Sequence, residues 1–481
     1  MPHVSIFPVN ETHIGVTSED VSILKEIDDF FQFDVPGSIH MKRQSRFKGW
    51  DGRIHLFKRG KLYRGLLPRL LSFCDDNSYT VDNTVPQPVP IQVQGFNTNP
   101  PLYDYQEAAV THGLTTHRAI IKSPTSSGKS LTIHTLITTL HTRTLIIVPT
   151  IGLVAQMRKD LLEYGSTEAD IQMLKGGEDK TVHKPIAITT WQNVFRLTPD
   201  YFNQFGCIVV DEVHLAKSKS LTHIMEMAFK VPFRFGLTGT LNDCEVHQLV
   251  LEGLFGSVFT CTNTATLIQQ ERVTPLNIKM CVLHYPEQVT QQLRRTPYQE
   301  EIDFLVAHQA RNIFIAELVK KLKGNTLVLF QLVQRHGKVL YDLVSENTSK
   351  TIHYIDGNVD ADTREAIQYE MEQTSNVILL ASYGTTQLGI SIKNLHNLVF
   401  AHPAKGSIRV LQSIGRVLRK HTSKSSATLY DLVDDLRIGK WTNHTFNHGK
   451  LRSEYYAREG FPAQLTEFNL ERLSHLRAAK R

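Results

Sequence analysis

The sequence predicts an α/β fold in which two tandem parallel α/β domains follow a small α+β domain. Short apolar segments alternate with helical patterns over residues 101–270 and again over residues 271–440. Such alternation is typical of parallel sheets covered by helices. A proline-rich stretch, residues 85–100, separates the first run from an N-terminal segment, residues 1–84, that has apolar residues of its own. We expect this stretch to be a linker, because its prolines disfavour regular helix.

Length and composition indicate a globular protein of several domains. The chain has 481 residues, 41% of them hydrophobic and 21% charged, which suits about two to four domains. No apolar run approaches the about 18 residues that span a bilayer, and no signal-peptide pattern opens the chain. The five cysteines are scattered without a C-x-x-C pair, so they indicate neither zinc nor a redox site. The sequence therefore predicts a cytosolic protein.

The N-terminal segment carries a concentrated basic region. Residues 4–9 are expected to be extended and residues 21–31 helical, because Leu24, Ile27 and Phe31 recur at helical spacing. Between Met41 and Leu70 the acid Asp51 stands among ten bases and four aromatic residues: Lys42, Arg43, Arg46, Lys48, Arg53, Lys58, Arg59, Lys61, Arg64 and Arg69, with Phe47, Trp50, Phe57 and Tyr63. Bases that neutralise phosphates and aromatics that stack on bases suggest DNA binding. The alternative is a solvated basic face with the aromatics in the module's core.

The first α/β run opens on a strand, a tight loop and a helix. Ile120 and Ile121 precede Ser123-Pro124-Thr125-Ser126-Ser127-Gly128-Lys129-Ser130, and an apolar helical pattern follows. Main-chain N–H groups of Ser126, Ser127 and Gly128 can surround a phosphate, Lys129 can reach the β- and γ-phosphates, and the Ser130 hydroxyl can bind Mg²⁺. Ser123 stands where the usual pattern has glycine, and an ordinary turn with a surface lysine is the alternative.

Two acids follow a later strand of the same run. The apolar segment Cys207–Val210 leads into Asp211-Glu212-Val213-His214. A carboxylate at a strand end beside a phosphate loop can hold Mg²⁺, which prefers oxygen ligands. The neighbouring Glu212 can orient or deprotonate the attacking water. Asp211 and Glu212 therefore predict nucleotide hydrolysis, and two solvated acids at the end of a strand are the alternative.

The second α/β run has no phosphate loop but carries paired arginines. Gln412, Arg416 and Arg419 have helical spacing, so we expect them on one helical face. Two guanidiniums could then stabilise charge on the γ-phosphate, and a plain basic helix face is the alternative. Residues 441–481 are expected to form a basic helical tail, and Asn443–His448 to be a solvated loop without metal or nuclease function.

In order, these segments resemble superfamily 2 helicases of the DExH type. The matching segments are Tyr105-Gln106, PTSSGKS, IIVPTIGLVAQ at 146–156, ITTWQ at 188–192, DEVH, Thr238-Gly239-Thr240 and QSIGRVLR. The similarity is greater still to the UvsW-type phage recombination helicases, through FFQF at 30–33, GWDGRIHLF at 49–57, SYGTTQLGISIKNLHNLV at 382–399 and GRVLRKHTSK at 415–424. The resemblance implies two RecA-like motor domains behind an N-terminal DNA-binding module.

The resemblance also implies site residues. Gln106 would read the adenine edge, while Lys129, Ser130 and Asp211 would hold phosphates and Mg²⁺. His214, Thr238, Thr240 and Gly389 would couple the ATP site to the DNA path. The implied DNA contacts are Lys48, Trp50, Arg53, Pro149, Thr150, Thr189, Thr190, Trp191, Thr385 and Thr386. Ser391 stands where related helicases often have Asp, which puts a ribose contact by that segment in doubt.

The resulting hypothesis is an ATP- and Mg²⁺-dependent DNA helicase acting in recombination, repair and replication. Its implied substrates are forks, D-loops, R-loops and Holliday junctions, remodelled by branch migration or fork regression. The resemblance further suggests 3′-to-5′ movement and a monomer. Two alternatives stay open: a helicase of RNA or RNA–DNA hybrids, and a DNA-binding protein that ATP merely switches, without unwinding.

Overall fold

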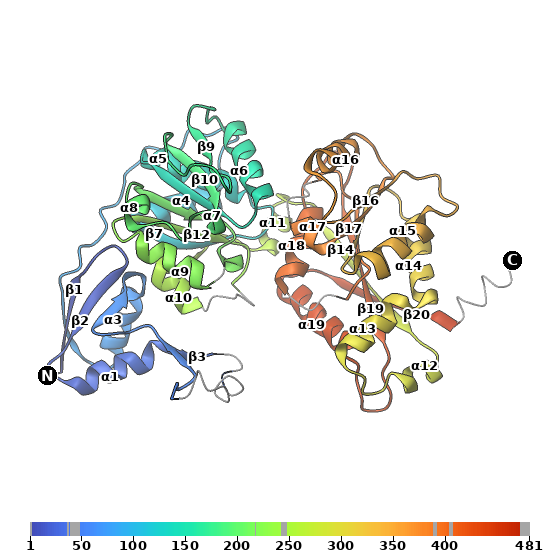
Figure 1. Ribbon diagram of the computed structural model, residues 1–481, viewed down its shortest axis with the longest axis horizontal. Helices are drawn as coiled ribbons and strands as arrows, with labels where there is room; N and C mark the ends of the chain where they lie inside the picture. The colour runs from blue at the N-terminus through green and yellow to red at the C-terminus, as the bar shows by residue number, and fades with distance from the viewer. Residues whose placement is uncertain are drawn as a thin grey trace. The chain divides into compact units, whose positions relative to one another are not determined.

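The computed structural model describes residues 2–35, 38, 49–216, 218–241, 248–387, 392–403 and 407–471. They fall into two compact units (Figure 1). Unit 1 comprises Met1–Ser123 and Gly128–Cys261, and unit 2 comprises Pro124–Ser127 and Thr262–Arg481. We refer to residues 2–83 as the N-terminal module, to residues 104–261 as lobe 1, and to residues 262–471 as lobe 2.

The N-terminal module is an α+β domain, as expected. Its elements are β1 (His3–Pro8), β2 (His13–Thr17), α1 (Val21–Phe30), β3 (Gln32–Asp34), β4 (Arg53–His55), β5 (Lys61–Tyr63), the 3-10 helix η2 (Arg64–Leu66), α3 (Leu67–Asp76) and β6 (Thr80–Asn83). Strands β5-β2-β1-β6 form one sheet, and β3 pairs with β4. The Asp20 side chain accepts a hydrogen bond from the Ser22 N–H at the start of α1, which satisfies an otherwise unpaired helix donor. Ile23 and Ile27 then face the core.

The proline-rich stretch forms no helix or strand, but it packs against lobe 1. Between β6 and α4 the chain has no regular secondary structure. Ile91, Phe96 and Leu102 pack on the core that α4 helps to form, and the Ile91 N–H donates to the Leu114 carbonyl at 3.1 Å. The stretch is therefore held along the surface of lobe 1.

Lobe 1 is a parallel α/β domain. Its elements are α4 (Asp104–Thr116), β7 (Arg118–Lys122), α5 (Lys129–Leu140), β8 (Thr144–Val148), α6 (Ile151–Glu163), β9 (Ile171–Met173), β10 (Ile186–Thr190), α7 (Trp191–Val194), α8 (Pro199–Phe202), β11 (Cys207–Val210), the 3-10 helix η3 (Val213–Leu215), α9 (Ser218–Met227), β12 (Phe233–Thr238), α10 (Gln248–Phe255) and β13 (Val258–Thr260). The seven strands run in the order β13-β7-β12-β11-β8-β10-β9, and every neighbouring pair is parallel.

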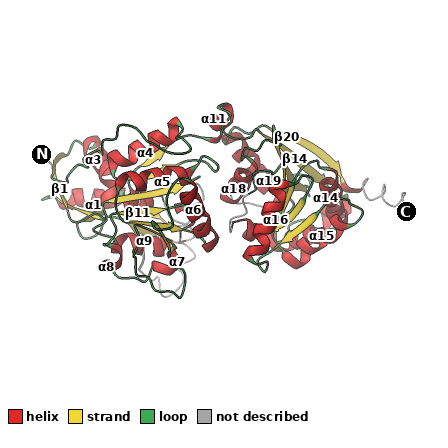
Figure 2. Ribbon diagram, turned by 90° about the horizontal axis from the view of Figure 1, so that it is seen from above, coloured by secondary structure: helices red, strands yellow, loops and turns green. Residues whose placement is uncertain are grey.

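Helices cover both faces of the lobe 1 sheet (Figure 2). Ile121 and Ile146 belong to the core that contains α4, α5 and α6, whereas Ile120 and Ile147 belong to the core that contains α9 and α10. Successive strand residues point to opposite faces, so strands buried on both sides are continuously apolar. This explains why the sequence showed these strands as unbroken apolar runs. The loops at the carboxyl ends of the strands carry the predicted site.

The N-terminal module and lobe 1 share one hydrophobic core. Arg234 of β12 lies fully buried at their junction and donates to the Thr12 hydroxyl at 2.9 Å, besides several carbonyls of its own lobe. Arg118, the first residue of β7, donates to Glu11 of the module at 2.7 Å, and Glu11 also pairs with Arg64 at 2.8 Å. The strands that carry the phosphate loop and Thr238 therefore begin against the module.

Lobe 2 is a second parallel α/β domain. Its elements are α11 (Thr264–Gln269), β14 (Leu276–His284), α12 (Glu287–Gln292), α13 (Tyr298–Ala307), α14 (Gln309–Lys321), β15 (Thr326–Phe330), the π-helix η4 (Val333–Gly337), α15 (Lys338–Ser345), β16 (Ile352–Ile355), α16 (Ala361–Gln373), β17 (Ile378–Ser382), α17 (Tyr383–Gln387), β18 (Asn397–Phe400), α18 (Ser407–Val417), β19 (Ala427–Asp435), α19 (His444–Arg458) and β20 (Ala463–Asn469). The seven strands run in the order β16-β17-β15-β18-β19-β14-β20, again in parallel. The prediction of two parallel α/β domains behind an α+β module is confirmed.

In its described part, the basic tail expected over residues 441–481 is helical over His444–Arg458, as expected, but it is not a tail. Asn443, expected in a solvated loop, is buried and precedes α19, where its amide donates to Glu301 at 2.9 Å. Arg452 is buried against Asp431, with Nε 2.8 Å from Oδ2. Strand β20 then pairs with β14 at the edge of the sheet. This segment is therefore integral to lobe 2, because its basic composition conceals a buried helix face.

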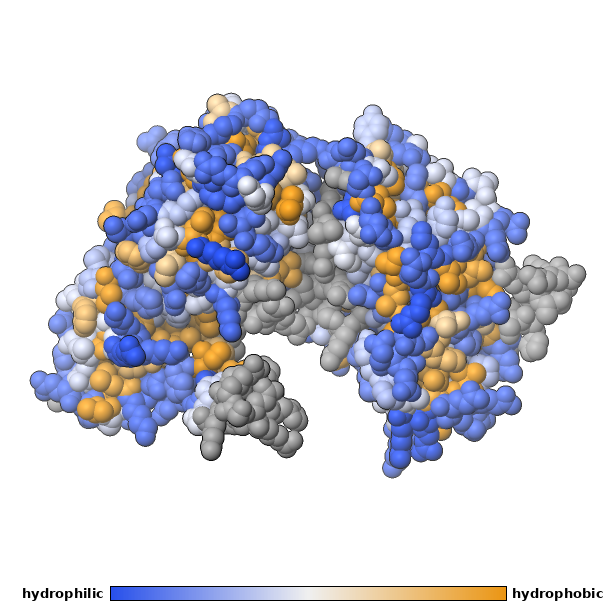
Figure 3. All heavy atoms as spheres, in the orientation of Figure 1, coloured by the Kyte–Doolittle hydropathy of each residue, from blue (hydrophilic) through white to orange (hydrophobic). Residues whose placement is uncertain are grey.

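On the face of each unit that Figure 3 shows, hydrophilic and hydrophobic residues are intermixed. Among the described residues, no helix is both long and apolar enough to cross a membrane.

Candidate functional site

The phosphate loop lies between β7 and α5, as the sequence predicts. Strand β7 ends at Lys122 and α5 begins at Lys129. Gly128 has a φ of 77° and Ser126 a φ of 67°, the left-handed region that glycine enters freely and serine rarely. The Lys129 ammonium folds back over the loop and donates to the Ser123 carbonyl at 3.4 Å. A tight turn at a helix N-terminus with a lysine over it can surround an anion.

Gln106 is joined directly to this loop. It is buried, and its Oε1 accepts a hydrogen bond from the Tyr103 N–H at 2.9 Å as part of the capping box of α4. Its Nε2 donates to the Gly128 carbonyl at 3.3 Å. A Cβ at Gly128 would lie 2.4 Å from that same Nε2. Glycine is therefore required at 128 both by its backbone angle and by the approach of Gln106.

The two predicted acids lie at the end of β11, beside the lysine of the loop. Glu212 Oε1 is 3.4 Å from Lys129 Nζ, and Glu212 adopts a left-handed φ of 47°, a strained conformation that often marks functional sites. Burial, and then the charge of Glu212, raises the pKa of Asp211 to about 7. Burial alone would raise the pKa of Glu212 too, but the charges of Lys129 and His214 hold that pKa below its usual value. Glu212 is thus the acid kept ionised, as a base requires.

His214 connects Glu212 to the end of β12. Burial lowers its pKa, against the charge of Glu212, which raises it. The Thr238 hydroxyl donates to the Thr240 carbonyl at 2.6 Å, which leaves the Thr238 oxygen to accept from His214 Nδ1 at 2.7 Å. The same nitrogen lies 3.3 Å from Glu212 Oε2. The structure thus brings together His214, Thr238 and Thr240. Through His214, they are joined to Glu212, the candidate catalytic base.

The residues predicted to hold Mg²⁺ offer suitable oxygen atoms. Asp211 carries a carboxylate whose charge is poorly compensated in the free protein, since its pKa is raised, and a bound cation would relieve this. Ser130 Oγ lies 3.1 Å from the Tyr164 hydroxyl, a neighbour that sequence reasoning missed because nothing in the pattern singles it out. Within the described part of the chain, His, Cys, Asp and Glu residues form no group of three or more that could hold a metal. The set therefore fits a cation shared with nucleotide phosphates.

Most of the predicted nucleic-acid contacts in lobe 1 have buried side chains. Pro149, Thr189, Thr190 and Trp191 are buried, and the Thr189 hydroxyl donates to the Leu174 carbonyl at 3.1 Å. The reason is that β10 is buried along its whole length. Thr150 is partly exposed at the N-terminus of α6, where its hydroxyl accepts from the Leu153 N–H. DNA contacts by these residues stay predictions, and Thr150 is the best placed of them.

The basic turn of the module is exposed and internally braced. Trp50 Nε1 donates to the Arg53 carbonyl at 2.9 Å, and Arg53 Nε donates to Asp34 at 3.0 Å. His55 contacts Asp51 at 2.8 Å and Asp28 at 2.9 Å. Lys48, and with it Lys42, Arg43, Arg46 and Phe47, lies outside the described residues.

Two of the aromatics interleaved with those bases lie in the interior instead. Phe57 belongs to the shared core, and the Tyr63 hydroxyl donates to Glu226 of lobe 1 at 2.7 Å. For these two aromatics the alternative of a core position is the correct one.

In lobe 2 the predicted arginines do not share one helix. Helix α18 ends at Val417, so Arg416 lies in its last turn and Arg419 lies beyond it. The Thr274 side chain and main chain hold the segment after the helix, through the Arg419 and Leu418 carbonyls. The expectation that helical spacing places Arg419 on the same face is therefore wrong. The Gln412 side chain lies outside the described part of the structure.

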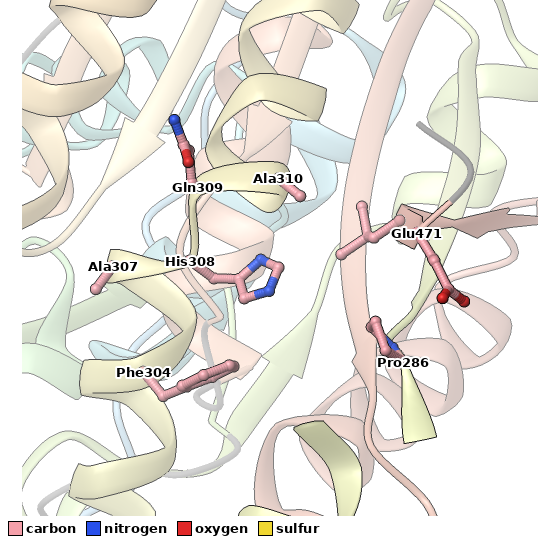
Figure 4. Close-up of a pocket in the computed structure, with 8 residues that line it drawn as sticks. Pro286, Phe304, Ala307, His308, Gln309, Ala310 and Glu471 are labelled. Atoms are coloured by element: carbon pink, nitrogen blue, oxygen red, sulfur yellow. The ribbon is translucent and has the colours of Figure 1, made fainter. Parts of the chain in front are cut away.

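The remaining predicted residues of lobe 2 follow β17. Thr385 is buried, with its hydroxyl 2.6 Å from the Ser382 hydroxyl, so its side chain closes the first turn of α17. The Thr386 side chain, Gly389 and Ser391 lie outside the described residues. A pocket elsewhere in lobe 2 contains none of the predicted residues (Figure 4); it is lined by Pro286, Phe304, Ala307, His308, Gln309, Ala310, Leu470 and Glu471.

Three family models match the chain in succession. Residues 10–83 match "DNA helicase UvsW, N-terminal", residues 99–243 match "Type III restriction enzyme, res subunit", and residues 309–421 match "Helicase conserved C-terminal domain". These matches correspond to the N-terminal module, lobe 1 and lobe 2.

The chain is also similar to individual proteins. The ATP-dependent DNA helicase uvsW of Enterobacteria phage T4 is 35% identical over 497 residues, covering 95% of this chain and 98% of the phage protein. The DNA 3'-5' translocase XPB2 of Sulfurisphaera tokodaii is 34% identical over 139 residues, 29% of this chain and 30% of that protein. Among solved structures, the DNA-bound restriction-modification enzyme LlaBIII has a TM-score of 0.57 at 14% identity, covering 79% of this chain and 32% of that one. The last similarity supports the fold alone.

Proposed function

Because the chain belongs to the UvsW family of ATP-dependent DNA helicases, we propose that it is a motor that remodels branched DNA. Its substrates are forks, D-loops, R-loops and four-way junctions, which it converts by branch migration or fork regression. The observation that carries this proposal is the N-terminal module. The turn Trp50–Arg53, which carries an aromatic and a basic side chain, belongs to a domain that shares its core with the ATPase lobe, so the proposed contact with a DNA branch is made by the same compact unit that carries Lys129 and Asp211.

The ATP chemistry is assigned to lobe 1. Main-chain N–H groups of Ser126, Ser127 and Gly128 surround the phosphates, and the Lys129 ammonium neutralises the β- and γ-phosphates. On nucleotide binding, Lys129 exchanges its long contact with the Ser123 carbonyl for phosphate oxygens. Ser130 and Asp211 would hold Mg²⁺, which would supply neutralisation of phosphate charge. Gln106 recognises the adenine edge, since an amide both donates and accepts hydrogen bonds.

Glu212 serves as the general base for the attacking water. Its lowered pKa keeps it ionised near neutral pH, and its strained backbone fixes the carboxylate beside Lys129. His214, which contacts Glu212, is hydrogen-bonded to Thr238, and Thr238 is hydrogen-bonded to Thr240 at the end of β12. A change at Glu212 is transmitted through these bonds. This chain of contacts couples hydrolysis to the DNA-binding side of lobe 1.

Lobe 2 supplies positive charge to the γ-phosphate and a second contact with the DNA backbone. Arg416 and Arg419 stabilise charge on the γ-phosphate, and Gln412 assists them. Thr150 in lobe 1 and the segment around Thr385, Thr386 and Gly389 in lobe 2 hold the DNA backbone in alternation. Repeated closure and opening of the lobes then produces translocation.

Remodelling of a labelled four-way junction tests the proposal. With ATP, the intact protein should convert the junction to duplex products, and Glu212→Gln should bind it without converting it. Displacement of a triplex-forming strand separates a translocase from an ATP-switched binding protein, because only translocation removes that strand. Matched DNA and RNA forks separate the DNA motor from an RNA helicase, since the 2′-hydroxyl is the available distinction.

The role of the module is tested by Trp50→Ala combined with Arg53→Ala. We expect the preference for a junction over linear duplex to fall while ATPase without DNA persists. Lys25→Ala is the control, because Lys25 is an exposed base of the same module outside the turn. Equal loss of both activities in the double variant would make the turn a structural part of the motor instead.

A further inference from the structure

We propose that Lys424 is a positioning residue for ATP hydrolysis, because its ammonium fixes the end of helix α18 and thereby places Arg416 and Arg419. The inference rests on the proposed function, in which these two arginines act on the γ-phosphate. Sequence reasoning had no reason to select Lys424, which lies between the arginine segment and β19.

The geometry is a bridge between two backbone segments. Lys424 Nζ donates to the Val417 carbonyl at 2.8 Å and to the Leu395 carbonyl at 2.8 Å. Val417 is the last residue of α18, and Leu395 lies in the segment that enters β18. One cation thus ties the end of the arginine helix to the chain leading into the central sheet.

A lysine suits this position for two reasons. The last carbonyls of a helix have no partner within the helix, and a cation there also interacts favourably with the partial negative charge of the helix C-terminus. Because Arg416 lies in the last turn of α18 and Arg419 just beyond it, the Val417 carbonyl is between the two. A displacement of this carbonyl would move both guanidiniums.

The turn that carries Lys424 is itself anchored. The Lys424 N–H donates to the His421 carbonyl at 3.3 Å, and the Ser423 hydroxyl donates to Asn394 Oδ1 at 2.5 Å. The Asn394 amide in turn donates to the Met371 carbonyl at 3.0 Å, at the end of α16. The backbone that carries Lys424 is therefore held in place.

The remaining side of the arginine segment is held by Thr274. Its N–H donates to the Leu418 carbonyl at 2.8 Å, and its hydroxyl donates to the Arg419 carbonyl at 3.1 Å. Lys424 on one side and Thr274 on the other thus fix three successive carbonyls, those of residues 417–419. Such fixation suits groups that must match a transition state closely.

The charge of the bridge depends on pH. Burial lowers the pKa of Lys424 to about 8, against the opposing effect of Glu372 and with a smaller contribution from Arg419. His396, whose pKa is lowered by burial, and His421 also lie around the turn. The ammonium therefore predominates below about pH 8 and is lost progressively as pH rises through that value, which weakens two charge-assisted hydrogen bonds.

Steady-state ATP hydrolysis by the full chain with saturating four-way junction tests the proposal. We expect Lys424→Met to lower kcat about tenfold or more with little change in KM for ATP, because misplacement of a catalytic group affects the transition state most. Lys424→Arg, which keeps the charge, should restore most of kcat. Lys420→Met is the matched control, because Lys420 is exposed in the same segment and should leave kcat unchanged.

Equal kcat values for Lys424→Met and Lys420→Met would overturn the proposal. If Lys424→Met melts well below the intact protein, the pH profile decides: kcat of the intact protein should fall above about pH 8, and that of Lys424→Arg should not. Coincident profiles would overturn the proposal as well. If the junction stimulates no variant but Lys424→Met still loses basal kcat, the DNA substrate is wrong and the role of Lys424 stands.

Discussion

Replacing Glu11 with glutamine is expected to loosen the N-terminal module from lobe 1. The Glu11 carboxylate pairs with Arg118 at 2.7 Å and with Arg64 at 2.8 Å, and its side chain is only 28% exposed. Removing one partner of a buried ion pair costs about 3–5 kcal/mol, and an exposed pair contributes at most about 1 kcal/mol. At this partial burial we expect a loss of about 2–3 kcal/mol, because two guanidiniums are left facing each other.

The loss corresponds to a fall of about 4–12 °C in the melting temperature of unit 1, at about 2–4 °C per kcal/mol for a unit of this size. Differential scanning calorimetry of the full chain measures it. Glu19→Gln makes the same chemical change at an exposed position of the module and should melt like the intact protein. If Glu11→Gln melted like Glu19→Gln, the carboxylate would not hold the junction, and the account of a fixed module would fail.

Two further predictions concern the loop and the basic turn. Gly128→Ala should abolish ATP binding in isothermal titration, because its Cβ would lie 2.4 Å from Gln106 Nε2 at a left-handed φ; retained binding would contradict the loop geometry. The hydrogen bond that His55 donates to Asp51, against the opposing effect of burial and with a smaller effect of Asp28, raises the pKa of His55. The raised pKa means that this pairing stabilises the folded module fully below the ordinary histidine pKa and is lost as pH rises through the higher value. Proton NMR titration should place the His55 pKa above that of free histidine, and a value at or below it would refute the bracing of the turn.

Much of the motor could be predicted from the sequence because its strands are buried on both faces. Such strands appear as short apolar runs, and β11 begins and ends where the apolar segment Cys207–Val210 does. The phosphate loop and the two acids each follow such a strand. The positions of the strands alone therefore predicted that the loop and the acids would lie close together at one edge of the sheet. Lys129 and Glu212 do lie 3.4 Å apart.

The parts that the sequence did not reveal depend on long-range burial of polar residues. Arg452 and Arg234 are fully buried, but in a sequence they cannot be told from surface bases, so the packed end of lobe 2 was mistaken for a tail. Arg419 continues the spacing of Arg416 although α18 has already ended. Thr189 was expected to contact DNA, but its hydroxyl donates to a carbonyl within the lobe.

A comparison of ATP hydrolysis by the intact protein and by Glu212→Gln decides whether the chain is a branched-DNA motor. Each protein is assayed without DNA and with duplex, single strand, four-way junction and matched RNA. The account predicts that the junction stimulates the intact protein most and that Glu212→Gln is silent under every condition. Hydrolysis that ignores DNA would contradict a branched-DNA motor, and a preference for RNA would leave the ATP chemistry intact while replacing its substrate.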